Sequence, residues 1–282
     1  MTTHFHAAAD GVSVAVHALG GQGPALVMAH AAGFHGMVFA PLAAELAADF
    51  RCVAPDGRGH GDTLLGGRPL DWPGLAADVL AAVDGLGLER PYAFGHSSGG
   101  TAVLLAEQAR PGTFRAMYCY EPIIIPVDPP LGTDTGNWLA AQARRRRDTF
   151  PSADEALRHY SSKPPLDALS PPALRAYVEH GFEDDGAGGV RLKCRPEDEA
   201  TVYETATGHD SYARLPEVTC PVTVACGGLT PGCDGTRPFA SEDRLPAGRS
   251  EVVPGVGHFG PLERPDVVAT AVRRALLGSA GP

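Results

Sequence analysis

The chain has 282 residues, of which 44% are hydrophobic and 20% are charged, a balance that is typical of a folded globular protein and excludes a disordered one. Its 33 acidic and 23 basic residues give a formal net charge of −10, which disfavours binding to nucleic acid or to anionic lipid. No apolar run approaches the ~18 residues that span a bilayer, and the first ten residues contain no Lys or Arg. We therefore expect neither a secretory signal nor a membrane partner.

Short apolar runs that are typical of strands alternate with helical patterns in the first part of the chain. The sequence predicts strands at residues 12–17, 25–29, 50–54, 91–95 and 115–120, and helices at residues 39–48, 72–86 and 100–109. The alternation resumes late in the chain, with strands predicted at residues 222–226 and 251–253 and a helix at residues 265–277. This order predicts an α/β fold, with a mainly parallel sheet and helices on both of its faces.

The alternation breaks between residues 126 and 216, where proline and glycine pairs separate several helical pieces. Helices are predicted there at residues 137–147, 153–160, 172–180 and 196–205. We interpret residues 126–216 as a helical lid, rather than a second sheet domain, inserted into a core of residues 1–125 and 217–282. Four aromatic residues of this lid are candidates to line a pocket beneath it: Trp138, Tyr160, Phe182 and Tyr203.

Four consecutive arginines, residues 144–147, end the first of these helices. Cations at the C-terminus of a helix interact favourably with the helix dipole. Because the chain is acidic overall, we predict that these arginines stay solvated rather than forming an anion site.

The six cysteines are too few for a disulfide scaffold in a chain of this length, and their spacing matches neither a zinc ribbon nor a CxxC pair. Cys52, Cys119 and Cys226 fall in predicted strands, where a free thiol acts as a small hydrophobic side chain. We expect a reduced, cytoplasmic protein that uses no metal ion and no organic cofactor.

The sharpest motif is G-x-S-x-G at residues 95–99, directly after an apolar strand and directly before a helix. Its glycines allow a sharp turn, so Ser97 would lie in a strained conformation with its hydroxyl exposed. The N-terminus of the following helix adds partial positive charge where an oxyanion would form. This context favours a nucleophilic serine over a simple turn.

A serine hydroxyl needs a base to become a good nucleophile, and the chain offers eleven histidines. His258 lies in a glycine-rich loop between the last predicted strand and the final helix. A loop at that position reaches the carboxyl edge of the sheet, where open α/β sheets bind their ligands. His258 is therefore the candidate base, and a histidine that only bonds to the backbone is the alternative.

Four motifs in this order resemble those of the α/β-hydrolase family: residues 30–34, residues 56–63, the serine motif, and residues 257–265. The resemblance covers residues of about 12–125 and 217–278 and leaves the lid largely unmatched. It implies that residues 56–63 form a structural turn. It also implies an oxyanion hole made by the backbone N–H groups of Ser98 and Ala32, with Gly33 and Phe34 as alternatives, because Ala31 stands where the family usually has glycine.

The triad acid departs from the family's pattern, because Thr230 stands where an aspartate is usual and a hydroxyl cannot stabilise a protonated imidazole as a carboxylate does. Glu121 ends a predicted strand, where a charge is costly unless it has a partner. Some members of the family, including haloalkane dehalogenases and zearalenone-lactone hydrolases, look similar in carrying the acid there. We favour Glu121 as the acid. Asp234, four residues after Thr230, is one alternative, and another residue or no acid at all is the other.

These residues predict a serine hydrolase that acts on a small-molecule carboxylic ester or lactone, with Ser97 as nucleophile, His258 as base and Glu121 as acid. One alternative is another reaction on the same residues, either carbon–carbon bond hydrolysis or perhydrolysis. Another is a ligand-binding protein that keeps the fold with little turnover. Haloalkane dehalogenation is disfavoured because it requires a carboxylate nucleophile at position 97.

Overall fold

An eight-stranded sheet forms the centre of the computed structural model, which describes residues 1–126, 131–134, 136–231, 233 and 242–278. The strand order is β1-β2-β4-β3-β5-β6-β10-β11. Strands β1 and β2 pair in antiparallel fashion, as do β2 and β4, and all other neighbours are parallel. The strands span Thr2–Ala7 (β1), Ser13–Gly20 (β2), Ala25–Ala29 (β3), Arg51–Pro55 (β4), Tyr92–His96 (β5), Met117–Tyr120 (β6), Val222–Gly227 (β10) and Gly248–Val253 (β11).

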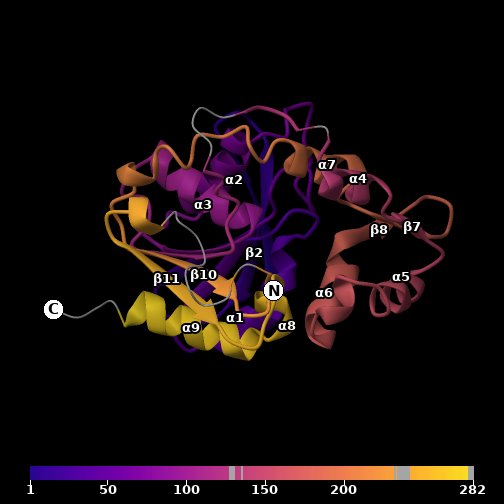
Figure 1. Cartoon of the computed structure of the whole chain (residues 1–282). Helices are drawn as coiled ribbons and strands as arrows, with labels where there is room; N and C mark the ends of the chain where they lie inside the picture. The colour runs from indigo at the N-terminus through magenta and orange to yellow at the C-terminus, as the bar shows by residue number, and fades with distance from the viewer. Residues whose placement is uncertain (127–130, 135, 232, 234–241, 279–282) are drawn as a thin grey trace.

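Helices cover both faces of this sheet (Figure 1). One face carries α2 (Trp72–Gly85) and α3 (Ser98–Ala109), and the other carries α1 (Ala40–Leu46), α8 (Gly260–Glu263) and α9 (Pro265–Leu277). Successive side chains of a strand point to opposite faces, so Ala93 and Phe94 of β5 belong to different buried clusters. The predicted α/β architecture is thereby confirmed.

The prediction omitted the first strand, β1, and placed the other strands of the sheet to within a few residues. Strand β1 lies at the edge of the sheet, and five of its six residues are exposed. Exposed edge strands lack the apolar pattern from which the other strands were recognised.

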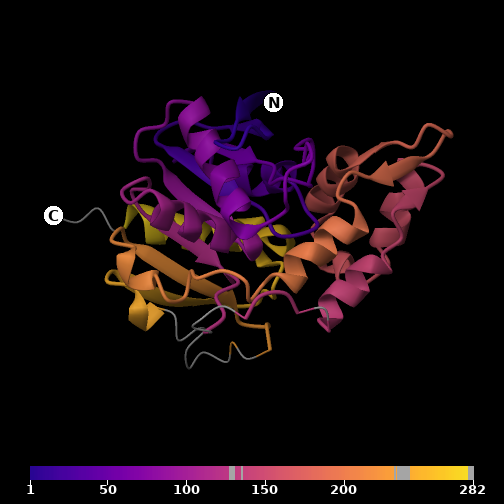
Figure 2. The same ribbon diagram turned by 90° about the horizontal axis from the view of Figure 1, so that it is seen from above.

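We call residues 126–216 the inserted segment, and its described helices and strands lie to one side of the sheet (Figures 1 and 2). The segment contains the four predicted helices, as α4 (Trp138–Arg144), α5 (Ala153–Tyr160), α6 (Pro171–Gly181) and α7 (Pro196–Glu204). It also contains a small antiparallel sheet in the order β7-β9-β8, made of Thr149–Phe150 (β7), Phe182–Asp184 (β8) and Val190–Leu192 (β9). The expectation of helices and turns alone missed this sheet, because strands of two or three residues are too short to show a period.

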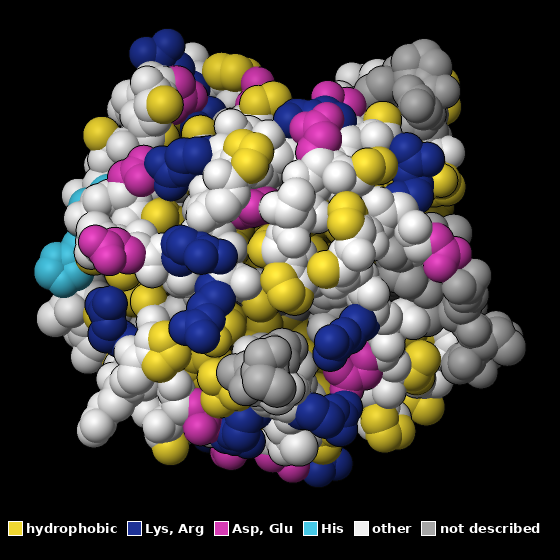
Figure 3. Space-filling model, turned by 90° about the vertical axis from the view of Figure 1, so that its left-hand side faces the viewer, with side chains coloured by type: hydrophobic (Ala, Val, Ile, Leu, Met, Phe, Trp, Pro, Cys, Tyr) yellow, Lys and Arg dark blue, Asp and Glu magenta, His cyan; other side chains and the backbone are white. Residues whose placement is uncertain are grey.

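Four short 3₁₀ helices connect these elements in the described residues, at Gly36–Phe39, Leu166–Ala168, Leu215–Glu217 and Glu242–Arg244. None of the described helices has the length and hydrophobicity needed to span a bilayer. On the face seen in Figure 3, acidic and basic side chains are interspersed and hydrophobic ones are scattered between them.

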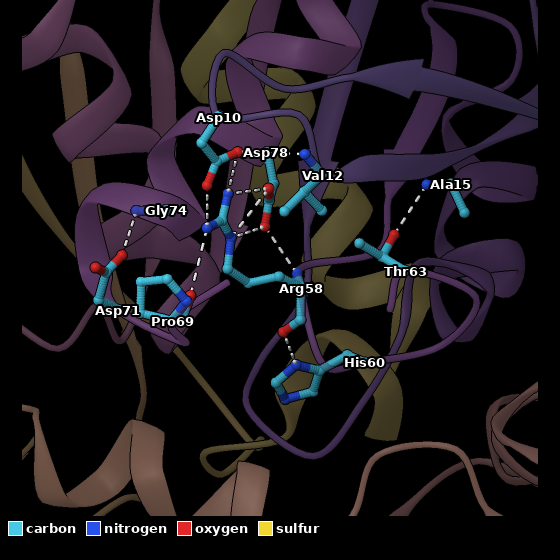
Figure 4. A network of polar contacts seen from close by, with 10 residues as sticks. All are labelled: Asp10, Val12, Ala15, Arg58, His60, Thr63, Pro69, Asp71, Gly74 and Asp78. Atoms are coloured by element: carbon cyan, nitrogen blue, oxygen red, sulfur yellow. Dashed lines mark hydrogen bonds and ion pairs between the residues drawn. The ribbon is translucent and has the colours of Figure 1, made fainter. Parts of the chain in front are cut away.

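A buried arginine holds the turn that follows β4 (Figure 4). The side chain of Arg58 is 1% exposed, and its guanidinium donates to Asp78 of α2 and to Asp10, which precedes β2, at 2.9 and 2.7 Å. The backbone N–H of Arg58 also donates to Asp78, at 2.8 Å. These bonds tie the turn to the α2 layer of the core.

The same turn is tied to the rest of the sheet through the buried carboxylate of Asp56. Its oxygens accept hydrogen bonds from the backbone N–H groups of Gly36 and Asp62, both at 2.7 Å. His17 Nε2 of β2 lies 3.0 Å from the same carboxylate. These contacts link the turn to β2 and to the loop after β3, and both oxygens of Asp56 accept hydrogen bonds.

We expect Arg58→Met to lower the free energy of unfolding by about 3–5 kcal/mol, because the buried Asp78 carboxylate would lose its partner. Arg110→Met is a matched control, since Arg110 pairs with Asp84 at the surface, where an ion pair contributes ~1 kcal/mol or less. Urea unfolding followed by circular dichroism measures both changes. Equal losses in the two variants would contradict the role assigned to burial of Arg58.

Candidate active site

Ser97 occupies a strained turn between β5 and α3. Its backbone angles are φ 54° and ψ −118°, in the region that is unfavourable for residues other than glycine. A side chain at Gly99 would overlap the carbonyl oxygen of Ala29, and one at Gly95 would overlap Gly100, so the turn requires both glycines. The N–H of Ser97 donates to the carbonyl of Tyr120 at 2.9 Å, which fixes the turn to the neighbouring strand.

The structure places Glu121 beside this turn, because β5 and β6 are parallel and in register. His96 and Tyr120 are partners in the two strands, so Ser97 and Glu121 leave the sheet at the same edge. Glu121 also has a positive φ, of 46°, and its N–H donates to the carbonyl of Ala225 in β10 at 2.7 Å. Both strands therefore end in strained residues that project from the carboxyl edge.

Glu121 and His258 are brought together across 137 residues of sequence. His258 Nδ1 lies 2.5 Å from Glu121 Oε2, and the carboxylate is 6% exposed against 38% for the imidazole. With its Nδ1 proton donated to Glu121, the imidazole keeps a lone pair on Nε2. That is the protonation state a general base requires.

The other oxygen of Glu121 is held by two donors from the loop after β10. The hydroxyl of Thr230 donates to Oε1 at 2.6 Å, and the N–H of Gly227 donates to it at 2.9 Å. Burial by itself raises the pKa of the Glu121 carboxyl, but the bonds from His258, Thr230 and Gly227 outweigh it and hold that pKa below its usual value. Thr230, which stands where the family has its acid, thus supports a carboxylate supplied by another strand. Asp234, the alternative acid, lies outside the described residues.

The loop that carries His258 is fastened to the same two strands. His96 Nε2 of β5 donates to the carbonyl of His258 at 2.8 Å, and the Tyr120 hydroxyl of β6 donates to the carbonyl of Gly257 at 2.7 Å. The N–H of Gly257 donates to Glu263 of α8 at 2.9 Å. Sequence reasoning did not identify these supporting contacts, and those of His96 and Tyr120 span 162 and 137 residues of the chain.

The second oxyanion donor is predicted in the loop after β3, residues 30–34. Buried His30 shapes this loop, with Nδ1 donating to the carbonyl of Ala31 at 2.8 Å and Nε2 accepting from the N–H of Gly57 at 2.9 Å. The N–H of Phe34 is bonded to the carbonyl of Ala31, at 3.2 Å. Ala32 lines the same cavity as Ser97, so it stays the best placed of the candidates from this loop.

A cavity of about 1010 Å³ opens between this edge of the sheet and the inserted segment. Ser97, Glu121 and His258 line it, together with Trp138, Tyr160 and Tyr203 of the inserted segment. Phe182, the fourth aromatic candidate, is buried instead against other rings, those of Phe150, Tyr160 and Tyr177. The volume is at the upper end of the range that is common for small-molecule sites.

The prediction that the four arginines stay solvated is wrong for Arg146, whereas Arg144 stays exposed but is paired with carboxylates. Arg144 bonds to Glu197 and Glu204 of α7, at 2.7 and 2.6 Å. The side chain of Arg146 is only 15% exposed, and it pairs with Glu199 of α7 at 2.5 Å. The acidic partners lie 53 or more residues away in sequence, and only the packing of α4 against α7 brings them close.

The pair formed by Arg146 and Glu199 also reaches the loop after β3. Gly33, with φ of 78°, lies so close to the pair that a side chain at this position would overlap the Glu199 carboxylate. Arg146 donates as well to the hydroxyl of Tyr177 on α6, at 2.6 Å. The inserted segment is therefore in direct contact with the backbone next to Ala32.

Comparisons with known proteins bear on the family and the fold of this chain. A family model described as "Alpha/beta hydrolase family" matches residues 26–271. The chain is 24% identical to the esterase YbfF of Escherichia coli K12, over 83% of this chain and 86% of that one, and 24% identical to the 2-(acetamidomethylene)succinate hydrolase of Mesorhizobium japonicum, over 89% and 87%.

Solved structures share the fold at low sequence identity. A crystal structure of E-2-(acetamidomethylene)succinate hydrolase superposes with a TM-score of 0.82 at 20% identity, covering 98% of both chains. The esterase RhEst1 from Rhodococcus sp. ECU1013 superposes with a TM-score of 0.74 at 23% identity, covering 100% of both. The α/β-hydrolase fold expected from the motifs is confirmed.

Burial of His30 makes the stability of the protein depend on pH. Burial lowers the pKa of His30 from 6.5 to about 3, so between these values the unfolded chain binds one proton more than the folded chain. The free energy of unfolding should therefore fall as pH falls from 7 to 5, with His30 accounting for about 2 kcal/mol of the decrease.

Between pH 7 and pH 5, the free energy of unfolding of His30→Asn should fall by about 2 kcal/mol less than that of the parent. The variant should nevertheless be less stable than the parent at pH 7. Urea unfolding at the two pH values measures the difference. If the two proteins lose the same free energy, His30 does not stay neutral in the folded state.

Proposed function

The chain belongs to the alpha/beta hydrolase family, and we propose that it is a serine hydrolase that cleaves a carboxylic ester or a lactone. The observation that carries the proposal is the hydrogen bond between His258 and Glu121 in the cavity that Ser97 lines. The strained conformation of Ser97 supports it, since such strain is common at nucleophiles of this type. The relatives that are named as esterases agree with it.

In the first half of the proposed reaction, Ser97 Oγ attacks the carbonyl carbon of the ester, and His258 Nε2 accepts the hydroxyl proton. The carbonyl oxygen becomes an oxyanion, which the N–H groups of Ser98 and Ala32 stabilise. The tetrahedral intermediate collapses when the carbon–oxygen bond to the alcohol breaks. His258 then donates its proton to the departing alkoxide, which leaves as a neutral alcohol, and the acyl group remains on Ser97.

In the second half, a water molecule replaces the alcohol. His258 Nε2 removes a proton from the water as its oxygen attacks the acyl carbon, and the same two N–H groups stabilise the second oxyanion. Collapse of this intermediate breaks the bond to Ser97 Oγ, which takes the proton back from His258. The carboxylic acid is released and the enzyme returns to its starting state, without a metal ion or an organic cofactor. With a lactone, the alcohol and the acid leave as one hydroxy acid.

Glu121 acts on the charge that appears on His258 during each step. The imidazole becomes an imidazolium cation when Nε2 takes a proton, and a carboxylate 2.5 Å from Nδ1 stabilises that cation. The interaction is strengthened because the carboxylate is buried, where the effective dielectric constant is lower than in water. Thr230 and Gly227 keep the second oxygen in place, so the carboxylate does not turn away from the ring.

We expect Ser97→Ala to lower kcat/KM for p-nitrophenyl acetate by at least about 10³-fold, because the variant lacks the nucleophile. A fluorophosphonate probe should label Ser97 in the parent, as read by mass spectrometry of the digest, and label no residue of the variant. Ser250→Ala, which removes an exposed hydroxyl from β11, is the matched control and should keep the parent's rate. An unreactive Ser97 in the parent would instead favour a ligand-binding protein.

Glu121→Gln keeps the shape of the side chain but removes the charge that stabilises the imidazolium. By analogy with the replacement of a triad aspartate by asparagine, kcat should fall by up to ~10⁴-fold. Thr230→Val keeps the carboxylate and removes one donor to it, so we expect a loss of roughly tenfold, the value of one hydrogen bond to a charged group. Thr230→Ser should recover most of that loss.

Asp234→Asn is the decisive comparison for the acid, and it should cost little. All four variants are assayed at one pH, after circular dichroism has shown that they are folded. If Asp234→Asn loses activity and Glu121→Gln stays active, Asp234 is the triad acid and Glu121 is a structural carboxylate. If neither Glu121→Gln nor Asp234→Asn lowers kcat appreciably, the enzyme works with a Ser–His dyad.

A further inference from the structure

The part of the cavity wall that the inserted segment supplies is rich in cations. Arg145 and Arg147 line the cavity just after α4, and Lys163 lines it just after α5. They share this cavity with Ser97 and His258, so a molecule positioned for reaction at Ser97 lies in the field of all three. This local group of positive charges contrasts with the overall charge of the chain, which has ten more acidic than basic residues.

The acidic residues of the cavity do not neutralise these cations. Of the residues that the structure describes, two carboxylates line it, and each already has a partner: Glu121 bonds to His258 and Glu199 to Arg146. Among the residues that the structure describes, no carboxylate forms an ion pair with Arg145, Arg147 or Lys163. The cavity therefore has an excess of positive charge.

Two arginines of the inserted segment that do not line the cavity, Arg144 and Arg158, are paired with carboxylates. Arg144, which immediately precedes Arg145, bonds to two glutamates of α7. Arg158 on α5 pairs with Glu155, one turn earlier on the same helix. Among the cavity-lining cations of the inserted segment that the structure describes, Arg146 is paired with Glu199, whereas Arg145, Arg147 and Lys163 have no carboxylate partner.

Arg147 is also oriented by its surroundings. Its guanidinium lies over the ring of Phe150, 4.2 Å from the centroid, and its Nε donates to the carbonyl of Thr149 at 2.9 Å. A planar guanidinium held in this way loses less side-chain entropy when it binds an anion. Much of the remaining wall is apolar, with Ile123, Ile125 and Leu139 among its residues, and apolar walls strengthen the attraction between charges.

We propose that Arg145, Arg147 and Lys163 form a subsite for a carboxylate, and that the substrate is an ester that carries a free carboxylate group away from the bond that is cleaved. This inference rests on the proposed ester hydrolysis at Ser97 and names the class of ester. A monoester of a dicarboxylic acid with an apolar chain fits the description. Its carbonyl would lie at Ser97 and its chain against the apolar wall, with its carboxylate on the three cations.

The first test measures binding and does not depend on turnover. In the Ser97→Ala protein, monomethyl octanedioate and dimethyl octanedioate are compared by calorimetry and by the fluorescence of Trp138, which lines the cavity. The two molecules have the same length and differ by one charge. We expect the monoester to bind at least tenfold more tightly, as for a hydrogen-bonded charge pair, and the ratio to decrease at high salt.

Substitutions then locate the subsite. In the Ser97→Ala background, Arg145→Gln and Lys163→Gln should each reduce the ratio of the two affinities several-fold, whereas Arg145→Lys should retain most of it. Arg158→Gln is the matched control, because it removes one cation from the inserted segment outside the cavity, and it should keep the parent's ratio. Thermal unfolding checks that each variant folds. Equal binding of the two molecules, or an equal effect of Arg158→Gln, would overturn the inference.

The second test measures catalysis in the protein that retains Ser97. The ratio of kcat/KM for mono-p-nitrophenyl octanedioate to that for p-nitrophenyl octanoate should be at least ten, and it should decrease in Arg145→Gln and Lys163→Gln. Hydrolysis of both esters with a ratio near one would refute the subsite and leave ester hydrolysis standing. Selective binding of the monoester without hydrolysis of any ester would refute ester hydrolysis and leave the subsite standing.

Discussion

The hydrogen bond between Glu121 and His258 is the interaction on which the candidate active site depends. It joins a strand end in the middle of the sheet to a loop 137 residues later, and it decides which nitrogen of the imidazole carries the proton. A buried carboxylate is unfavourable unless its oxygens are bonded, and here the three donors come from His258, Thr230 and Gly227. The loop after β10 therefore serves the site by stabilising the acid of the neighbouring strand.

The register of the sheet explains why these groups meet. Strands β5, β6 and β10 are parallel neighbours, and His96, Tyr120 and Ala225 are aligned across them. The residues that follow each of them, among them Ser97 and Glu121, consequently emerge at one edge of the sheet. His96 and Tyr120 also fasten the loop of His258, so the same two strand ends position both the nucleophile and the base. A shift of one residue in either pairing would separate them.

The inserted segment contacts the loop that carries Ala32 and also supplies part of the cavity wall. Its buried pair, Arg146 and Glu199, lies against Gly33 in the loop that carries Ala32, so the conformation of the segment and that of the oxyanion loop are coupled by contact. The neighbouring arginines, Arg145 and Arg147, line the cavity beside this pair. One short run of sequence thus supplies both a structural ion pair and the cations of the proposed carboxylate subsite.

The sequence by itself determined the fold class, the order of strands and helices, and the candidacy of Ser97 and His258. These features are local: the apolar period of each element, and a serine or histidine in a glycine-rich turn between a strand and a helix, can be recognised within about ten residues. Only the tertiary structure decided how distant residues combine. It brought Glu121 to His258, made Thr230 a donor to Glu121, and paired Arg144 and Arg146 with glutamates of α7. Sheet register and helix packing set those contacts, and neither leaves a period or a motif in the chain because each depends on segments 50 or more residues apart.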